Sequence, residues 1–321
     1  MTDTIAAGLT EVLMRPWLMV LPILLDLYYW IGWRLLPSAL TARIARVASD
    51  ELMFDKRSNM NWLRDVGKLD LSGMLGLTVP SMLVGIDREN VYEIWTRPTI
   101  VPDSYLIVGL ITVLFFLAAS LCSMTFLVPL ADVVSGRKRP WRQLPRAVGV
   151  AWLRVLGLQT IVFGLIALVF GPIVVMTAVF AYGGVDVTGL AQSLGVMSAL
   201  PAIVFLWFVL AAIAAAEVGP FRAIYLSVNV VRRNFWQTVG LITASILIGS
   251  GFFEILVRIG LPELWVKIVD TPPGLLVAVV AHAYFAVSLA IASLIFFTDR
   301  LRLLRFDAAP RAFPVTRRSA I

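Results

Sequence analysis

The sequence predicts an all-α membrane protein: a polytopic transmembrane helical bundle of six spans, built as three units of elbow, helix and helix. Three observations lead to this prediction. Hydrophobic residues make up 60% of the 321 residues and charged residues 15%, which is far more apolar than a soluble domain. The apolar residues fall into runs that are long enough to cross a hydrocarbon core of about 30 Å. Most of the bases stand beside these runs, as the positive-inside rule predicts.

Residues 219–243 define the elbow, by which we mean an amphipathic helix, a polar hinge and the start of an apolar run. The stretch reads GPFRAIYLSVNVVRRNFWQTVGLIT. Its Gly-Pro pair ends the preceding apolar run, and its apolar residues recur at helical spacing among polar ones. Residues 232–234 form the hinge, and the Phe-Trp pair at 235–236 is expected at headgroup depth. The sequence therefore predicts an interfacial helix on the membrane surface.

The same arrangement recurs at residues 136–160, which are 83 positions earlier, so that Gly157 falls on Gly240 and Thr160 on Thr243. The N-terminus resembles a weaker first elbow, with its hinge at Arg15 and Pro16. Recurrence at a fixed period is typical of chains built from repeated structural units.

Each apolar run that precedes an elbow or the C-terminal tail closes with an acid that is followed by a base. A carboxylate is unfavourable at the negative end of a helix dipole, so each acid is expected to have a basic partner nearby. The predicted pairs are Asp132 with Arg137, Glu217 with Arg222, and Asp299 with Arg300.

The first half of the chain gives two regions. Residues 1–36 are expected to hold the N-terminal elbow and the first span, which runs from about residue 17 to residue 36. Residues 37–103 contain eight Lys/Arg and nine Asp/Glu residues, a balance like that of a soluble protein, and form an insertion. Within it, residues 39–54 predict an amphipathic helix. The uncharged run at 71–86 is short for a span and is expected to lie in the interface or to dip in as a re-entrant segment.

The second half of the chain is expected to contain spans two to six within residues 104–298, followed by a basic cytoplasmic tail at 299–321. The third span is expected to kink at Gly171 and Pro172. The expected spans cover about residues 105–130, 150–182, 194–216, 236–260 and 275–297.

The distribution of bases predicts the orientation. The loop at 136–147 has five bases and no acid, and the loop at 219–235 has three bases and no acid. The loops on the opposite side are poor in bases. Both termini and all three elbows are therefore expected in the cytoplasm, with the chain crossing the cell membrane several times and the 37–103 insertion outside the cytoplasm.

The phrase SVNVVRRNFWQTVGL at 227–241, together with the parallel phrase at 144–160, resembles a group of uncharacterised six-helix bacterial membrane proteins. They are related to the membrane domain attached to some glycerophosphodiester phosphodiesterases, and the resemblance covers about residues 105–300. It implies a membrane-resident helper domain. The sequence has no counterpart of the phosphodiesterase domain, so the resemblance does not imply its catalytic activity.

Catalytic, cofactor and metal signatures are missing from the sequence. There is no Walker A motif, Rossmann glycine fingerprint, Gly-x-Ser-x-Gly or paired-cysteine spacing. The single histidine, His282, excludes HExxH and multi-histidine metal sites. The single cysteine, Cys122, excludes an intramolecular disulfide. We therefore expect no catalytic residue, cofactor or metal, and we expect no nucleic-acid partner because the bases flank the apolar runs.

Four ionisable residues within the predicted spans form the candidate polar site: Asp26, Glu254, Arg258 and His282. Asp26 is about 13–15 Å from either end of its span. It therefore either has a functional role or is a protonated carboxyl that is hydrogen-bonded to a neighbouring helix. Glu254 and Arg258 are four residues apart and can neutralise each other. His282 either forms a hydrogen bond to a neighbouring helix as a neutral side chain or has a proton-handling or ligand-binding role. We expect Asp26 and at least one of Glu254 and His282 to face the bundle interior.

Two functions from different classes follow. The first is a non-enzymatic scaffold or assembly partner, which contacts the lipid bilayer and a membrane-protein partner or a second copy of the chain. The alternative is a transporter or permease subunit in which Asp26, Glu254 and His282 line a pathway. In either case the bases of the elbows anchor them or bind anionic headgroups. These bases are Arg137, Lys138, Arg139, Arg222, Arg232 and Arg233.

Overall fold

The structure is a computed structural model that describes residues 2–51, 68, 70–76, 79, 98–182, 188–247 and 271–308. Almost all of these residues are helical, which confirms the all-α class. The elements are α1 (Thr2–Met14), η1 (Pro16–Met19), α2 (Val20–Ile31), β1 (Arg34–Leu35), α3 (Ser38–Glu51), η2 (Leu71–Gly76), β2 (Thr99–Ile100), α5 (Tyr105–Ser135), η4 (Trp141–Gln143), α6 (Leu144–Tyr182), α7 (Thr188–Leu206), α8 (Val209–Ala216), α9 (Pro220–Arg233), α10 (Phe235–Ile246) and α13 (Pro272–Ala308).

Among the described residues, three helices are long and apolar enough to cross a membrane: Tyr105–Ser135, Trp141–Ile173 and Pro272–Leu303. A fourth span is counted if the bent pair Thr2–Met14 and Pro16–Ile31 is taken as one. These lengths and compositions are those of a membrane protein. The predicted fifth span, at 236–260, extends past residue 247 into residues outside those described.

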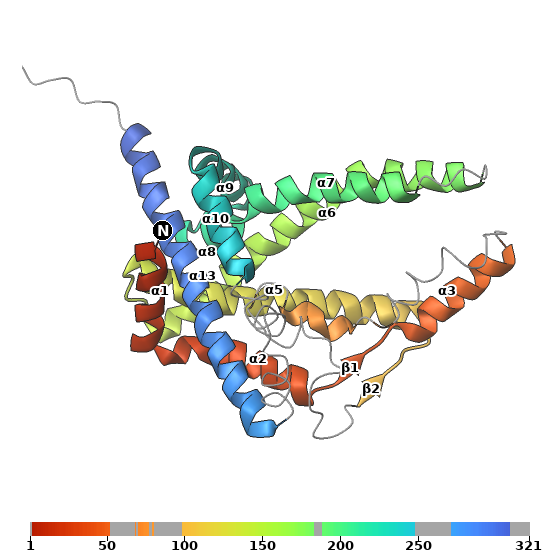
Figure 1. The fold of residues 1–321 in the computed structure, drawn as a ribbon, viewed down its shortest axis with the longest axis horizontal. Coiled ribbons are helices and arrows are strands. Elements are labelled where there is room, and N and C mark those ends of the chain that lie inside the picture. The colour runs from red at the N-terminus through yellow and green to blue at the C-terminus, as the bar shows by residue number, and fades with distance from the viewer. Residues whose placement is uncertain are drawn as a thin grey trace, which may run out of the picture.

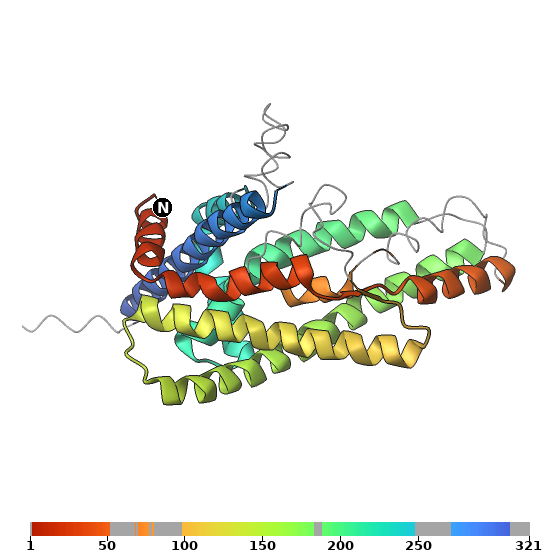
Figure 2. The same ribbon diagram turned by 90° about the horizontal axis from the view of Figure 1, so that it is seen from below.

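The polar loops gather at one end of the molecule. Helices α5, α6 and α7 extend along the long axis of the molecule (Figures 1 and 2). Helix α1, helix α9, the C-terminal end of α5 and the C-terminal end of α13 all lie toward the left of Figure 1. This part of the molecule, which carries the bases of residues 137–146 and of α9, is named the basic end below.

The first predicted span is shorter than expected. A bend of 98° separates Thr2–Met14 from Pro16–Ile31, at the position predicted for the first hinge. Helix α2 has 12 residues, about 18 Å of helix, instead of a span to residue 36. It ends because Gly32 is extended and residues 34–35 pair with Thr99 and Ile100 as parallel strands.

The strand pair closes the base of the 37–103 insertion. Arg34 N–H donates to the carbonyl of Pro98 at 3.0 Å, and Leu36 N–H donates to that of Ile100 at 3.1 Å. The insertion thus leaves and rejoins the bundle at one place. Its first helix, α3, occupies the region predicted to be helical at 39–54.

The beginning of the uncharged run at 71–86 is buried in the bundle as η2. This turn packs against α5 and α2. Tyr29 Oη donates to the carbonyl of Ser72 at 3.2 Å, and Ser72 is 0% exposed. The residues of this run that the structure describes lie beside a candidate span, which agrees with a segment that dips into the bilayer. Its depth in a membrane stays a prediction.

The fourth predicted span, at 194–216, is broken into α7 and α8 at residues 207–208. Neither residue is a proline or glycine, and the side chain of Ser227 from α9 stabilises the break. Its hydroxyl donates to the carbonyl of Phe205 at 2.7 Å and accepts from Phe208 N–H at 3.2 Å. The freed backbone groups are therefore satisfied from a neighbouring helix, as a break at membrane depth requires.

The second elbow departs from the pattern of the third. Helices α9 and α10 are separate, with Asn234 between them at φ −130° and its Nδ2 donating to the carbonyl of Val230 at 3.1 Å. The position that precedes it by 83 residues is Ala151, which has no polar side chain and lies inside the continuous helix α6. The second elbow therefore has no hinge at the position that corresponds to Asn234. Helix α6 also continues through Pro172 without interruption.

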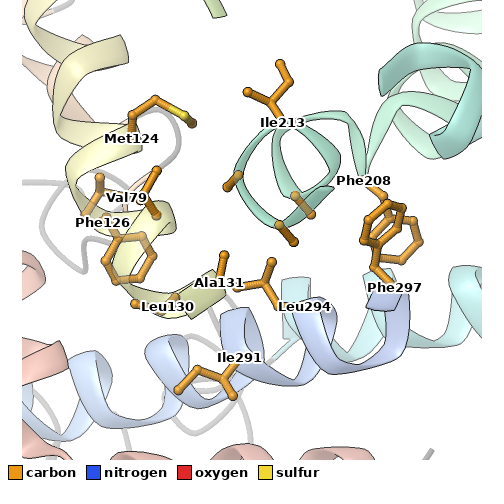
Figure 3. Packing of buried hydrophobic residues seen from close by; sticks show 14 of the residues in the cluster. Val79, Met124, Phe126, Leu130, Ala131, Phe208, Ile213, Ile291, Leu294 and Phe297 are labelled. Atoms are coloured by element: carbon orange, nitrogen blue, oxygen red, sulfur yellow. The ribbon is translucent and has the colours of Figure 1, made fainter. Parts of the chain in front are cut away.

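Helix α13 forms the centre of the core. It runs to Ala308, beyond the predicted end at residue 297. Its residues Ile291, Leu294 and Phe297 are all buried. Figure 3 shows Leu294 beside Ala131 of α5 and Phe297 beside Phe208, whereas Ile291 lies on the opposite side of the helix. Helix α1 crosses α13 so closely that a Cβ on Gly8 would overlap the carbonyl oxygen of Ser288.

Candidate functional site

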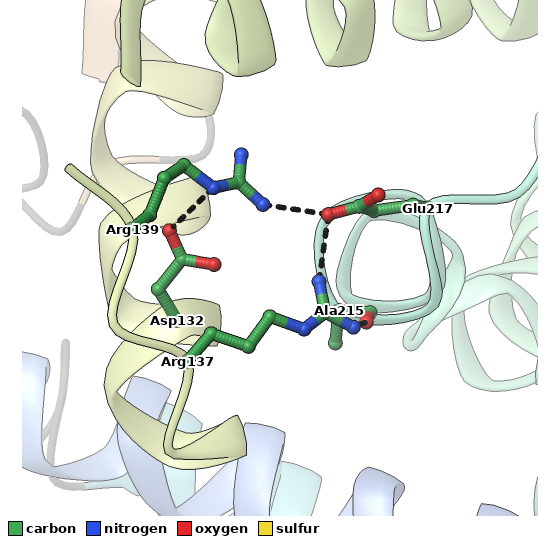
Figure 4. Close-up of polar contacts among 5 residues, drawn as sticks. All are labelled: Asp132, Arg137, Arg139, Ala215 and Glu217. Atoms are coloured by element: carbon green, nitrogen blue, oxygen red, sulfur yellow. Dashed lines mark hydrogen bonds and ion pairs between the residues drawn. The ribbon is translucent and has the colours of Figure 1, made fainter. Parts of the chain in front are cut away.

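Four charged side chains form a network at the basic end. Arg139 Nε lies 3.2 Å from Asp132 Oδ2, and Arg139 Nη2 lies 2.6 Å from Glu217 Oε1. Arg137 Nη1 contacts the same Glu217 oxygen at 2.7 Å. Figure 4 shows both arginines spanning the space between the ends of α5 and α8. Two acids that lie 85 positions apart in the chain, at 132 and 217, are joined by two bases of one loop.

The local backbone explains why the network forms. Gly136 adopts the left-handed conformation at φ 68°, which ends α5 and turns the chain, and Arg137 N–H caps the carbonyl of Asp132 at 2.9 Å. Glu217 ends α8 in the same conformation at φ 52°. Arg137 Nη2 also donates to the carbonyl of Ala215 at 2.7 Å. The arginines therefore stabilise two helix C-termini, where cations are favoured by the dipole.

The pairing differs from the sequence-based prediction. Asp132 pairs with Arg139 through its side chain rather than with Arg137, and Glu217 pairs with Arg137 and Arg139 rather than with Arg222. The third predicted pair also differs, because Arg300 Nη2 donates to Gln237 Oε1 at 2.8 Å. Proximity in sequence assigned Arg137 to the wrong acid, because the 136–147 loop crosses from α5 to the end of α8.

We expect Arg139→Met to destabilise the protein by about 3 kcal/mol, because it leaves the buried Asp132 carboxylate without its ion-pair partner. The Arg139 and Asp132 side chains are 14% and 10% exposed, so solvent screens their pair weakly. Arg142→Met is the matched control, since Arg142 is exposed in the same loop. The measurement is unfolding in mild detergent followed by tryptophan fluorescence. Equal stabilities of the two variants would show that the network does not hold the helix ends together.

The six bases predicted to contact lipid fall into two groups. Arg137 and Arg139 are engaged in the network. The other four are exposed at the surface of the basic end: Lys138, Arg222, Arg232 and Arg233. These four are the better candidates for headgroup contacts.

Asp26 and His282 are both buried, with 0% and 2% exposure. They lie on α2 and α13, which contact each other. Asp26 and His282 are therefore interior side chains, as expected for Asp26 and at least one of Glu254 and His282. Glu254 and Arg258 lie outside the described residues, so a polar site that unites all four stays a prediction.

A pocket that was not predicted from the sequence lies between α5, α6 and the break that separates α7 from α8. It has a volume of about 230 Å³, and its walls include Phe116, Val155 and Leu210. Three polar residues, Ser120, Ser123 and Gln159, also line it. The small residues in AASLCS at 118–123 are the signal that could have found it, because small side chains leave room between helices.

Among the described residues, no group of three or more His, Cys, Asp or Glu side chains could hold a metal ion. Comparisons with protein-family models, curated proteins and solved structures found no match.

Proposed function

We propose that the protein is a non-enzymatic membrane scaffold or assembly partner whose basic end lies at the cytoplasmic face of the cell membrane. The observation that carries the proposal is the gathering of exposed bases and tryptophans at this end. Trp17, Trp141 and Trp236 stand at or just before the starts of α2, α6 and α10, with exposures of 44%, 75% and 82%. The rings of Trp17 and Trp141 are 6.1 Å apart. Bases and tryptophans together are typical of the cytoplasmic membrane interface.

Helix α9 supports the proposal because its two faces differ. Ala223, Ser227 and Val230 are buried against the bundle. Phe221 and Tyr225, one turn apart, are 73% and 67% exposed. Large exposed aromatic side chains beside bases are suited to the headgroup region, where their rings are half solvated. We propose that this exposed face lies on the cytoplasmic leaflet and contacts a partner there.

The remaining topology is proposed on the same basis. Six spans and cytoplasmic termini agree with the base distribution, and the bend at Arg15 agrees with the first elbow. The resemblance to the six-helix proteins described above, which supports a helper role without catalysis, stays a prediction.

Site-specific photocrosslinking in cells tests the scaffold role. A photoreactive amino acid replaces Tyr225 on the exposed face of α9, and a second variant carries it at Leu168, which is 73% exposed on α6. The scaffold proposal predicts one discrete protein adduct, or a dimer of this chain, from position 225 and lipid adducts from position 168. Lipid adducts alone from both positions would overturn it.

Transport is the second candidate, and the burial of Asp26 and His282 on neighbouring helices favours it. Proteoliposomes that contain the protein and a trapped pH dye separate the two functions. Under the scaffold proposal the protein has no proton pathway, so wild type and Asp26→Asn give the same proton flux as empty liposomes. The Asp26→Asn variant should still fold, because the amide preserves hydrogen bonding. A proton flux in wild type that Asp26→Asn abolishes would favour transport instead.

A further inference from the structure

The pocket between α5, α6 and the α7–α8 break lies deep within the candidate spans. Ser120 is 15 residues from each end of α5, and Gln159 is 15 residues from the start of α6. Each of these positions is about 22 Å along its helix from the nearest end. If the protein spans the bilayer as proposed above, on which this inference rests, the pocket opens near the centre of the hydrocarbon core.

The walls of the pocket are suited to a hydrocarbon chain. Apolar side chains from α5, α6, α7 and α8 dominate the lining, and its volume of about 230 Å³ exceeds the ~150 Å³ of an apolar cavity that takes up benzene. An empty space of this size would deprive the surrounding side chains of dispersion contacts. Acyl chains surround a protein at this depth, so they are the molecules available to fill it.

Two of the three polar residues in the lining have hydrogen bonds within the protein. Ser120 Oγ donates to the carbonyl of Leu117 at 2.8 Å and accepts from Trp152 Nε1 at 2.9 Å. Ser123 Oγ donates to the carbonyl of Ala119 at 2.8 Å.

Gln159 differs from these serines. Its Oε1 is buried and has no hydrogen-bond partner among the residues that the structure describes. A buried acceptor without a donor has given up its hydrogen bond to water without a replacement, so a ligand that supplies one hydroxyl would be favoured there.

We propose that this pocket binds an uncharged lipid that carries one hydroxyl group, with its chain against Phe116, Val155 and Leu210 and its hydroxyl donating to Gln159 Oε1. None of the lining residues that the structure describes is a Lys, Arg, Asp, Glu or His. A phospholipid headgroup at this depth would be unpaired and costly. A long-chain alcohol is the simplest member of the proposed class.

Two photoactivatable probes with the same chain test the hydroxyl: a diazirine-bearing hexadecanol and the matching hexadecane. The full-length protein is reconstituted in phosphatidylcholine vesicles, each probe is added, and labelled peptides are quantified. The alcohol is expected to label the pocket segments of α5 and α6 more strongly than the alkane. Gln159→Leu should lower labelling of the pocket by the alcohol about threefold, the usual strength of a hydrogen bond within a membrane, and leave labelling by the alkane unchanged.

A filled pocket provides the second test. Val155 is 2% exposed and lines the pocket, whereas Leu165 is 59% exposed on the same helix. Val155→Trp should abolish labelling of the pocket by the alcohol, and Leu165→Trp should leave it intact. Equal labelling by both probes in wild type, or unchanged labelling in Gln159→Leu, would overturn the proposal.

The same experiment separates this inference from the proposed function. Labelling of exposed positions such as Leu168 by either probe shows that the helices are in lipid. Labelling there with none in the pocket overturns the lipid site alone. Absence of labelling along the whole of α6 contradicts the membrane proposal itself.

Discussion

Replacement of Gly8 by leucine is expected to detach α1 from α13 and to destabilise the protein by about 3 kcal/mol or more. A Cβ at this position would overlap the carbonyl oxygen of Ser288 and would lie 3.3 Å from the nitrogen of Ala292. Both atoms belong to the backbone, so no side-chain rotation relieves the overlap. Overpacking of this kind typically costs about 1–3 kcal/mol, and here α1 must move as well.

Gly109→Leu is the matched control, because Gly109 is exposed in α5 and a Cβ there meets nothing within 4 Å. Unfolding temperatures in mild detergent compare the two variants. The control should unfold near the wild-type temperature, since leucine also has the higher helix propensity. A Gly8→Leu variant as stable as the control would show that α1 does not pack on α13.

Removal of the Ser227 hydroxyl is the second change with a large expected effect. Ser227→Ala leaves Phe208 N–H and the carbonyl of Phe205 without the partner that joins them across the α7–α8 break. Unsatisfied buried backbone groups cost about 1–3 kcal/mol each, so we expect a loss of about 2–4 kcal/mol. The ring of Phe208 lies 5.7 Å from those of Phe296 and Phe297, so a shift at the break also disturbs the core.

Ser288→Ala provides the comparison, because Ser288 is equally buried but donates only within its own helix, to the carbonyl of Tyr284 at 2.7 Å. Its loss should change stability by less than about 1 kcal/mol, since the helix backbone remains bonded. Amide hydrogen exchange in the segment 203–210 should rise in Ser227→Ala and stay unchanged in Ser288→Ala. Equal exchange in the two variants would contradict the proposed role of the hydroxyl.

Local signals in the sequence predict the helices well. Gly219 and Pro220 predict where one helix begins, and the polar residues at 232–234 predict where it ends. The structure places this helix at Pro220–Arg233. The hinge at Arg15 and Pro16 coincides with the 98° bend. These features depend on residues within one turn of the boundary, where glycine, proline and polar side chains act directly on the backbone.

Features that depend on residues from distant parts of the chain could not be predicted. The break at Phe208 has no glycine or proline, and its hydrogen-bond partner, Ser227, lies on another helix. The chain also gives no indication that Arg139 joins Asp132 to Glu217, because the three-dimensional crossing of the loop decides that contact.

The candidate sites show the same division. Burial of Asp26 and His282 follows from their positions in apolar runs. The pocket beside Gln159 requires α5, α6, α7 and α8 to leave space at one level, which composition alone does not specify.

Accessibility of single cysteines tests the membrane topology most directly. With Cys122 replaced by alanine, single cysteines at Gly136, Asn229 and Asp103 are treated in intact cells with an impermeant thiol reagent. Gly136 and Asp103 lie just beyond opposite ends of α5, and Asn229 lies on α9. Position 103 should be labelled in intact cells, whereas positions 136 and 229 should be labelled only after the cells are permeabilised. Labelling of position 229 from outside, or of positions 103 and 136 from the same side, would contradict this topology.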